Sequence, residues 1–148
     1  MNRKTIGIIV AYTIVMASLL FVTFGLNWNP SGYDYKVEGD TLTIERGMIA
    51  SETQEVNIQD KQSTALLFYT ALSKERGQWN IDLTMIGLLL PFILLLFVPE
   101  KQPLKETVPR KWYRLVVISA AVLYLAYSIT QHVTNISLIQ TYVERLLS

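Results

Sequence analysis

An uninterrupted run of 21 uncharged residues, Ile6 to Leu26, constrains this chain more than any other feature. At about 1.5 Å per residue, a helix of this length covers the hydrocarbon core of a bilayer, which is roughly 30 Å thick. Backbone polar groups in lipid must be satisfied within the segment, so the run predicts a transmembrane helix. A cleaved signal peptide is the alternative, because Arg3 and Lys4 precede the run. The run is longer than a signal-peptide core and lacks an A-x-A cleavage site, which favours an uncleaved anchor.

Two later segments, Leu83 to Val98 and Tyr113 to Thr130, are also apolar enough to cross a membrane. The first of them is short and reaches a full span only if it begins near Asp82. Pro91 stands in its middle, where a proline removes one amide donor and presses on the carbonyl four residues earlier, at Gly87. We expect a bend that a neighbouring helix supports. A broken helix of the kind found in transporters is the alternative.

The composition agrees with a membrane protein and excludes several kinds of partner. Hydrophobic residues make up 51% of the chain, charged residues only 17%, and the mean hydropathy is +0.30. The 13 Lys and Arg residues nearly balance the 12 Asp and Glu residues, so we expect no nucleic-acid partner. The chain has no cysteine and a single histidine, His132, which excludes disulfides and Cys- or His-cluster metal sites. We therefore expect no metal and no cofactor.

Small residues recur at helical spacing in the apolar segments, where they let helices approach closely in lipid. In the first segment three of them follow one another seven residues apart, from Ala11 to Gly25. The residues predicted to pack against another helix are Gly7, Ala11, Ser18, Gly25, Ser119 and Ala126. We expect them to hold the chain's own helices together. Self-association through the same face is the alternative.

The basic residues predict the orientation of the chain in a plasma membrane, since short cytoplasmic loops are enriched in Lys and Arg. They gather before the first apolar segment and between the second and the third, at Arg3, Lys4, Lys101, Lys105, Arg110, Lys111 and Arg114. Three spans place both groups on one side, so we expect the amino terminus in the cytoplasm and the carboxyl terminus outside. The expected interface aromatics are Trp28 and Trp79 on the outer side, and Trp112 and Tyr113 on the inner side.

Between Trp28 and Trp79 the apolar runs give way to alternation. Apolar residues stand at every second position on either side of Gly39 and Asp40. A two-residue link headed by glycine between such runs predicts a tight β-hairpin. A further turn at Arg46 and Gly47 and a third strand within Met48 to Ile58 complete a predicted antiparallel meander.

A helix is expected after the meander, over residues 63–76. Asp60 or Ser63 would cap its amino end, and Gly77 would end it. This region of about 50 residues has too few large apolar side chains to fold alone, so it needs cover. The carboxyl tail, residues 132–148, has apolar residues at helical spacing and is the expected cover. A tail lying on the membrane surface is the alternative.

Residues that point to chemistry are few. The sequence has none of the common motifs for nucleotide binding, zinc-dependent hydrolysis or serine acyl transfer. Asp34, Glu38 and Asp40 alternate along a predicted strand and are expected on its solvated face rather than around a cation. Asp82 and His132 are expected at the ends of apolar segments, so no ionisable residue lies in the middle of a span. We therefore predict that the protein is not an enzyme.

The predicted fold class is an α+β integral membrane protein, with three transmembrane helices, a small extracytoplasmic antiparallel β-meander and an amphipathic helix. The predicted parts are the first transmembrane helix (1–27), the extracytoplasmic meander and helix (28–79), the second transmembrane helix (80–98), a short basic cytoplasmic loop (99–112), the third transmembrane helix (113–131) and an extracytoplasmic helical tail (132–148).

This architecture favours a non-enzymatic accessory, regulatory or immunity-type subunit. Its expected partners are the lipid bilayer and another membrane or envelope protein. An oligomeric transport or channel component is the alternative.

Overall fold

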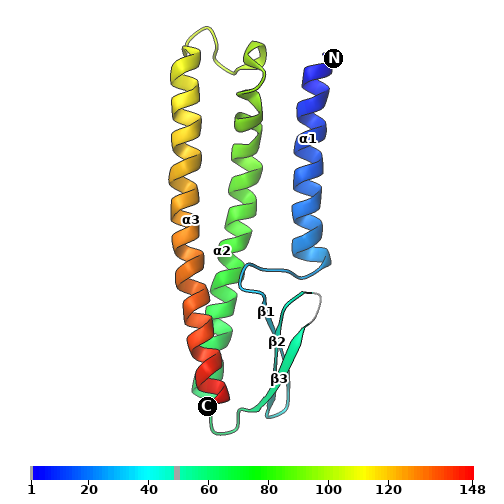
Figure 1. Cartoon of the computed structure of the whole chain (residues 1–148), viewed down its shortest axis with the longest axis vertical. Helices are drawn as coiled ribbons and strands as arrows, with labels where there is room; N and C mark the ends of the chain where they lie inside the picture. The colour runs from blue at the N-terminus through cyan, green and yellow to red at the C-terminus, as the bar shows by residue number, and fades with distance from the viewer. Residues whose placement is uncertain (1, 49–50) are drawn as a thin grey trace.

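The computed structural model describes residues 2–48 and 51–148, which form three long helices and one small sheet (Figure 1). The helices are α1 (Arg3–Leu20), continued by a π-helical turn (Phe21–Gly25), α2 (Gln62–Leu95) and α3 (Arg110–Leu147), with a short 3₁₀ turn at Pro99–Lys101. The strands are β1 (Tyr33–Glu38), β2 (Thr41–Arg46) and β3 (Glu52–Asn57). Helix α2 lies between α1 and α3 (Figure 1). The predicted α+β class is confirmed.

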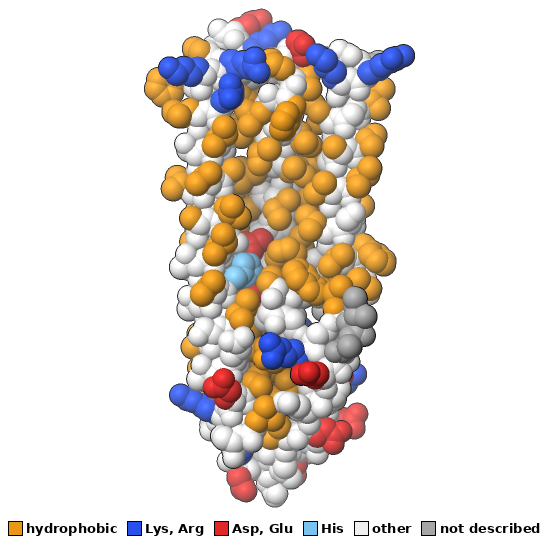
Figure 2. All heavy atoms as spheres, in the orientation of Figure 1, with side chains coloured by type: hydrophobic (Ala, Val, Ile, Leu, Met, Phe, Trp, Pro, Cys, Tyr) orange, Lys and Arg blue, Asp and Glu red, His pale blue; other side chains and the backbone are white. Residues whose placement is uncertain are grey.

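All three helices are long and apolar enough to cross a membrane, as the sequence predicted. The amino terminus and the link between α2 and α3 lie at one end, here called the loop end (Figure 1). The sheet and the carboxyl terminus lie at the other, the sheet end. Figure 2 shows apolar side chains over the middle of the molecule and a group of Lys and Arg side chains at the loop end. The two basic clusters therefore share one end of the bundle.

One contact joins those clusters directly. The Lys4 ammonium lies 2.9 Å from the Glu100 carboxylate and donates a hydrogen bond to it. This bond holds the pKa of Glu100 below its usual range. Both side chains are more than half exposed, so the pair contributes little to stability. The contact shows that the start of α1 lies beside the link that follows α2.

Helix α2 runs through Gly77 without a break, which corrects the predicted helix end there. Neither Asp60 nor Ser63 caps α2; Lys61 occupies the cap position, and its side chain makes no capping bond. A glycine inside a helix costs only about 1 kcal/mol. Contacts with α3 on both sides of Gly77, described below, outweigh that penalty. The predicted amphipathic helix and the second apolar segment therefore form one continuous helix.

The sheet is the predicted meander, in the order β1-β2-β3 with antiparallel pairing. Gly39 has a φ of +60°, the conformation that the first central residue of a tight hairpin turn requires. The register places Val37 opposite Leu42, and Leu42 opposite Val56. The third strand begins at Glu52; the earlier part of its predicted range includes residues 49 and 50, which lie outside the described residues.

The hydrophobic core lies between the sheet and the sheet-end halves of α2 and α3. Phe68 and Leu72 from α2 and Ile139 from α3 are completely buried against it. The predicted docking of the carboxyl tail on the meander is therefore confirmed. The tail is the last part of α3 rather than a separate helix. The Lys61 ammonium donates to the Leu146 carbonyl at 2.8 Å, at the helix end where a cation is favourable.

Pro91 lies inside α2, and a neighbouring helix supports the backbone there, as expected. The hydroxyl of Tyr12 in α1 donates to the carbonyl of Gly87 at 3.3 Å, the group whose helical partner Pro91 removes. A side chain at Gly87 would come within 3.3 Å of the terminal carbon of Met16. Close approach of α1 to α2 therefore depends on Gly87 and Tyr12.

The small residues predicted to pack between helices do not make that contact within the chain. Gly7, Ser18 and Gly25 are exposed, as are Ser119 and Ala126 of α3, and only Ala11 is partly covered. Helix α1 instead faces α2 with larger residues such as Tyr12 and Met16. A small side chain permits close approach of two helices but does not determine which face of a helix makes the contact. Contact with a second copy of the chain through these residues stays a prediction.

Candidate functional site

A cluster of polar side chains joins α2 to α3. Figure 2 shows its histidine beside acidic side chains, between apolar ones. Glu75 and Asp82 stand seven residues apart on one face of α2 and are 0% and 4% exposed. His132 of α3 lies between them: its Nδ1 is 2.5 Å from Glu75 Oε1, and its Nε2 is hydrogen-bonded to Asp82 Oδ2. The single histidine of the chain thus links two carboxylates of the neighbouring helix.

Asp82 is the most connected member of this cluster. Its Oδ1 accepts hydrogen bonds from the Tyr124 hydroxyl at 2.6 Å and from the Gln78 amide at 3.0 Å. Donors from both helices therefore converge on one carboxylate, an arrangement that satisfies a buried anion.

The hydrogen bonds constrain the charge of the cluster. Carboxylates only accept, and a neutral imidazole has a single N–H to donate, yet both ring nitrogens of His132 face carboxylate oxygens. Both contacts are hydrogen bonds when His132, Glu75 and Asp82 share one additional proton. Wherever it resides, two carboxylates and one added proton give a formal net charge of −1.

The cluster is not arranged as a metal site. The imidazole stands between the two carboxylates with one nitrogen toward each, so the three groups do not converge on a common point. Among the described residues no group of three His, Cys, Asp or Glu side chains is placed to hold a metal ion. Its hydrogen bonds instead join helices and position polar atoms at the edge of a groove.

That groove, here called the helix groove, lies between α2 and α3 and has a volume of about 590 Å³. Asp82, Tyr124, Ser128 and His132 line its polar end. Beyond His132 the lining continues for one turn of α3 with Val133 and Ile136. The larger apolar part extends toward the loop end, lined by Ile86, Leu89, Leu90, Ile93, Ala121 and Leu125. The groove has the size and the composition of small-molecule sites, which are largely apolar with a few convergent polar groups.

Two tryptophans stand at the polar end of the helix groove. The rings of Trp28 and Trp79 meet edge to face, with centroids 5.2 Å apart, and both line the groove. The Trp79 indole N–H donates to the Thr23 hydroxyl at 2.9 Å. Thr23 lies in the π-helical turn after α1, a kind of helix irregularity that is frequent at functional sites. Trp28 and Trp79, predicted as interface residues, thus connect three parts of the chain: the turn after α1, the loop that follows it, and α2.

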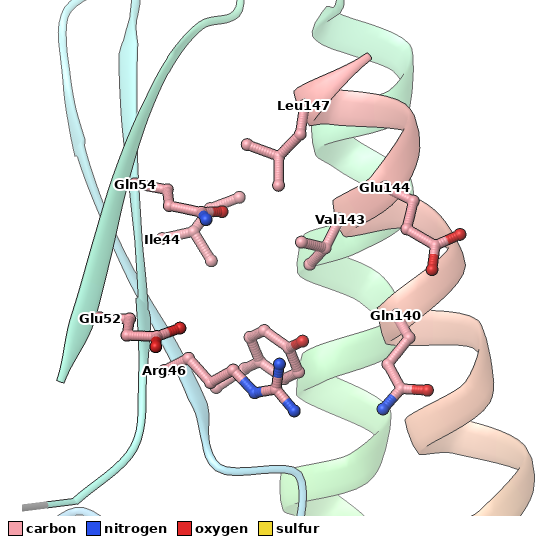
Figure 3. Close-up of a pocket in the computed structure, with 9 residues that line it drawn as sticks. Ile44, Arg46, Glu52, Gln54, Gln140, Val143, Glu144 and Leu147 are labelled. Carbon is pink, nitrogen blue, oxygen red and sulfur yellow. The ribbon is translucent and has the colours of Figure 1, made fainter. Parts of the chain in front are cut away.

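A second concavity, here called the sheet cleft, lies between the sheet and the end of α3 and has a volume of about 370 Å³ (Figure 3). Figure 3 shows side chains from the sheet facing side chains from α3 across it. Its floor is formed by Tyr33, Ile44, Val143 and Leu147, and its rim by Arg46, Glu52, Gln54, Gln140 and Glu144.

The sequence of β3 explains why the sheet cleft is open. Alternate residues of a strand share a face, so Glu52 and Gln54 point to the same side as the buried Val56. Polar side chains stand where apolar ones would close the sheet onto α3. The Arg46 guanidinium, opposite Glu52 in the register, lies over the Tyr33 ring at 5.4 Å from its centroid.

Several predicted positions acquire a different role in the structure. Asp82 and His132, expected at the ends of apolar segments, are hydrogen-bonded to each other within long helices, where Asp82 is buried and His132 half-buried. Asp34 is not simply solvated, because it accepts from Arg76 at 2.7 Å. At the loop end Trp112 is 59% exposed, and the Tyr113 hydroxyl donates to the Phe92 carbonyl at 3.0 Å.

The sequence reasoning missed Glu75 and Tyr124, although a signal for the cluster exists. Glu75, Gln78 and Asp82 recur on one helical face, and Tyr124, Ser128 and His132 recur every four residues on another.

No protein-family model, curated protein or solved structure matches the chain.

Proposed function

We propose that the protein is a non-enzymatic, multi-pass plasma-membrane protein of the accessory, regulatory or immunity type. It binds a segment of another membrane or envelope protein in the sheet cleft. The observation that carries this proposal is the cleft itself: an apolar floor with a charged and amide rim, left open by Glu52 and Gln54 of β3. Such a mixture of apolar and polar groups suits recognition of a peptide segment.

The edge of the sheet supports the same proposal. Strand β3 is paired with β2 on one side only, so its other edge carries backbone N–H and C=O groups available to a further strand. A partner segment that adds to this edge would place alternate side chains in the sheet cleft. Glu52, Arg46 and Glu144 would then select its charge pattern.

The proposed orientation is amino terminus in the cytoplasm and carboxyl terminus outside. It is supported by the Lys and Arg side chains at the loop end, since positive charge is retained on the cytoplasmic side. The sheet cleft then faces the extracytoplasmic space. A partner there belongs to the same membrane or to the envelope beyond it.

Site-specific photo-crosslinking in intact cells tests this function. A photoreactive side chain at Gln54 or Gln140, on opposite walls of the sheet cleft, should give one discrete adduct with a second protein. The same group at Lys74, which is exposed on α2 and does not line the cleft, is the control. Adding Arg46→Glu should abolish the adduct. Equal adducts from Lys74, or an adduct that is insensitive to Arg46→Glu, would show that the cleft is not the binding site.

A transport or channel component, acting as an oligomer, is the second candidate. The observation that favours it is the polar cluster, because ionisable residues within candidate spans often mark ion or proton paths. Proteoliposomes test it directly. A proton or cation flux through the wild-type protein that Asp82→Asn abolishes would favour transport, and an absence of flux would exclude it for those ions.

A further inference from the structure

The helix groove carries an inference that is independent of partner binding at the sheet cleft. We propose that it binds a membrane amphiphile with a cationic, ammonium-type head group. The head lies beside Asp82 and against the Trp28–Trp79 pair, and the hydrocarbon chain lies along the apolar walls of α2 and α3.

The shape of the groove sets the size of the ligand. Its lining extends from Asp82 to Ile93 on α2, which is about 16 Å along a helix axis and matches an extended dodecyl chain. On α3 the opposite wall includes Ala121 and Leu125. The small side chain of Ala121 leaves room that a larger residue would fill.

The charge at the polar end sets the sign of the head group. Glu75, Asp82 and His132 together carry a net charge of −1, and among the described lining residues there is no Lys or Arg. A phosphate or carboxylate head would meet Asp82 with no Lys or Arg to pair with, and His132 already faces two carboxylates. A cationic head instead neutralises the cluster, so the electrostatic match favours ammonium over an anionic head.

The aromatic residues favour the same head group. Trp28, Trp79 and Tyr124 all line the polar end of the groove. The faces of aromatic rings attract cations, and quaternary and methylated ammonium groups are recognised by several such rings near a carboxylate. The ring planes of Trp28 and Trp79 lie at 83° to each other, so the pair presents aromatic surface in two directions beside the carboxylate.

The bilayer position of the groove is compatible with this ligand. The polar end lies on the sheet side of the groove, near the loop that contains Trp28, a residue type that prefers the membrane–water interface. The apolar part extends toward the middle of the candidate spans. An amphiphile in the membrane would enter with its head at the interface and its chain in the hydrocarbon region.

Binding is measured with the full chain in a neutral detergent, using dodecyltrimethylammonium whose chain carries a bromine quencher. A Trp112→Phe background leaves Trp28 and Trp79 as the only tryptophans. Saturable quenching is expected. Brominated dodecanol, which has the chain without the charge, should bind about tenfold more weakly or worse, and butyltrimethylammonium should not compete.

Two variants test the two halves of the site separately. Asp82→Asn should weaken binding of the cationic probe by about tenfold while leaving the uncharged probe nearly unchanged. Ala121→Phe fills the apolar part without altering the charge and should weaken both probes. Glu100→Gln, at the loop end, is the matched control and should change neither. Binding is compared only between variants whose helical content and thermal midpoint match those of the wild-type protein. If Asp82→Asn fails to fold, Ala121→Phe still tests the site.

The proposal is overturned if the charged and uncharged probes bind equally, or if Asp82→Asn leaves the preference intact, because the head group would then not be recognised. It is also overturned if quenching is linear and unaffected by Ala121→Phe, which would indicate partition into the detergent rather than binding. If no photo-crosslink forms at Gln54 but the amphiphile still binds, the proposed partner binding is rejected and the amphiphile site stands.

Discussion

The Tyr12 hydroxyl of α1 hydrogen-bonds to the Gly87 carbonyl of α2, the acceptor that Pro91 deprives of its helical donor. A proline in a transmembrane helix leaves such a carbonyl without a partner unless another group supplies the hydrogen bond. Here the donor comes from the adjacent helix, so the irregularity in α2 becomes an attachment point for α1.

Tyr12→Phe should therefore destabilise the docking of α1, by about 0.5–1.5 kcal/mol for one hydrogen bond. The measurement is unfolding of the purified protein in detergent. In a Pro91→Ala background the new amide of residue 91 can satisfy Gly87, so Tyr12→Phe should cost markedly less. Equal costs in both backgrounds would mean that the tyrosine acts by packing alone.

Removal of the His132 side chain should be much more disruptive. His132→Ala leaves Glu75 and Asp82 buried without their shared partner, and breaking a buried ion pair from one side typically costs about 3–5 kcal/mol. Thr134→Ala, an exposed change on the same helix, serves as control.

A triple variant in which His132, Glu75 and Asp82 all become Leu should recover most of the lost stability, because no unpaired charge remains. If the triple variant is no more stable than His132→Ala, the cluster holds α2 and α3 together through its geometry rather than through charge pairing.

Loss of the tail contacts should open the sheet end. Ile139 and Val143 are buried against the sheet, and replacing a buried aliphatic side chain with a small one costs about 2–5 kcal/mol at well-packed sites. Ile139→Ser with Val143→Ser should make β2, whose Leu42 and Ile44 share this core, susceptible to added protease while the helices stay in the membrane. Leu138→Ser, at an exposed position, should have no such effect. Unchanged proteolysis of the double variant would show that α2 alone is sufficient to hold the sheet.

Labelling of single cysteines in this cysteine-free chain tests the proposed orientation. Ser51 and Glu106 are exposed at opposite ends of the bundle. In intact cells an impermeant thiol reagent should label Ser51→Cys and not Glu106→Cys, and permeabilised cells should label both. The reverse pattern would place the sheet in the cytoplasm. Gln102 is unsuitable for this purpose because it is buried and donates to the Val108 carbonyl.

The parts of the fold that the sequence predicted depend on local signals. The three apolar runs form helices, Gly39 lies in the hairpin turn, and the last apolar residues share the buried face of α3, as predicted. The docking of the tail also followed, because the meander clearly lacked enough apolar side chains of its own.

The polar cluster could not be predicted in the same way, because it depends on the register between two antiparallel helices. Glu75 stands two residues before Gly77, where the sequence predicted the end of a helix. Only with α2 continuous do Glu75 and Asp82 fall on one face, and only the packing of α3 brings His132 between them. Each residue alone is ordinary; their pairing is a tertiary property.

The continuity of α2 and α3 has a mechanical consequence. Helix α3 has 38 residues, about 57 Å at the usual rise, and its final turns are part of the core beneath the sheet. A rigid rod of that length converts a tilt of about 5° at one end into a displacement of about 5 Å at the other. Because no hinge separates the candidate span from the docked segment in α3, changes in bilayer thickness or lateral pressure would reach the sheet as motion of its supporting helix.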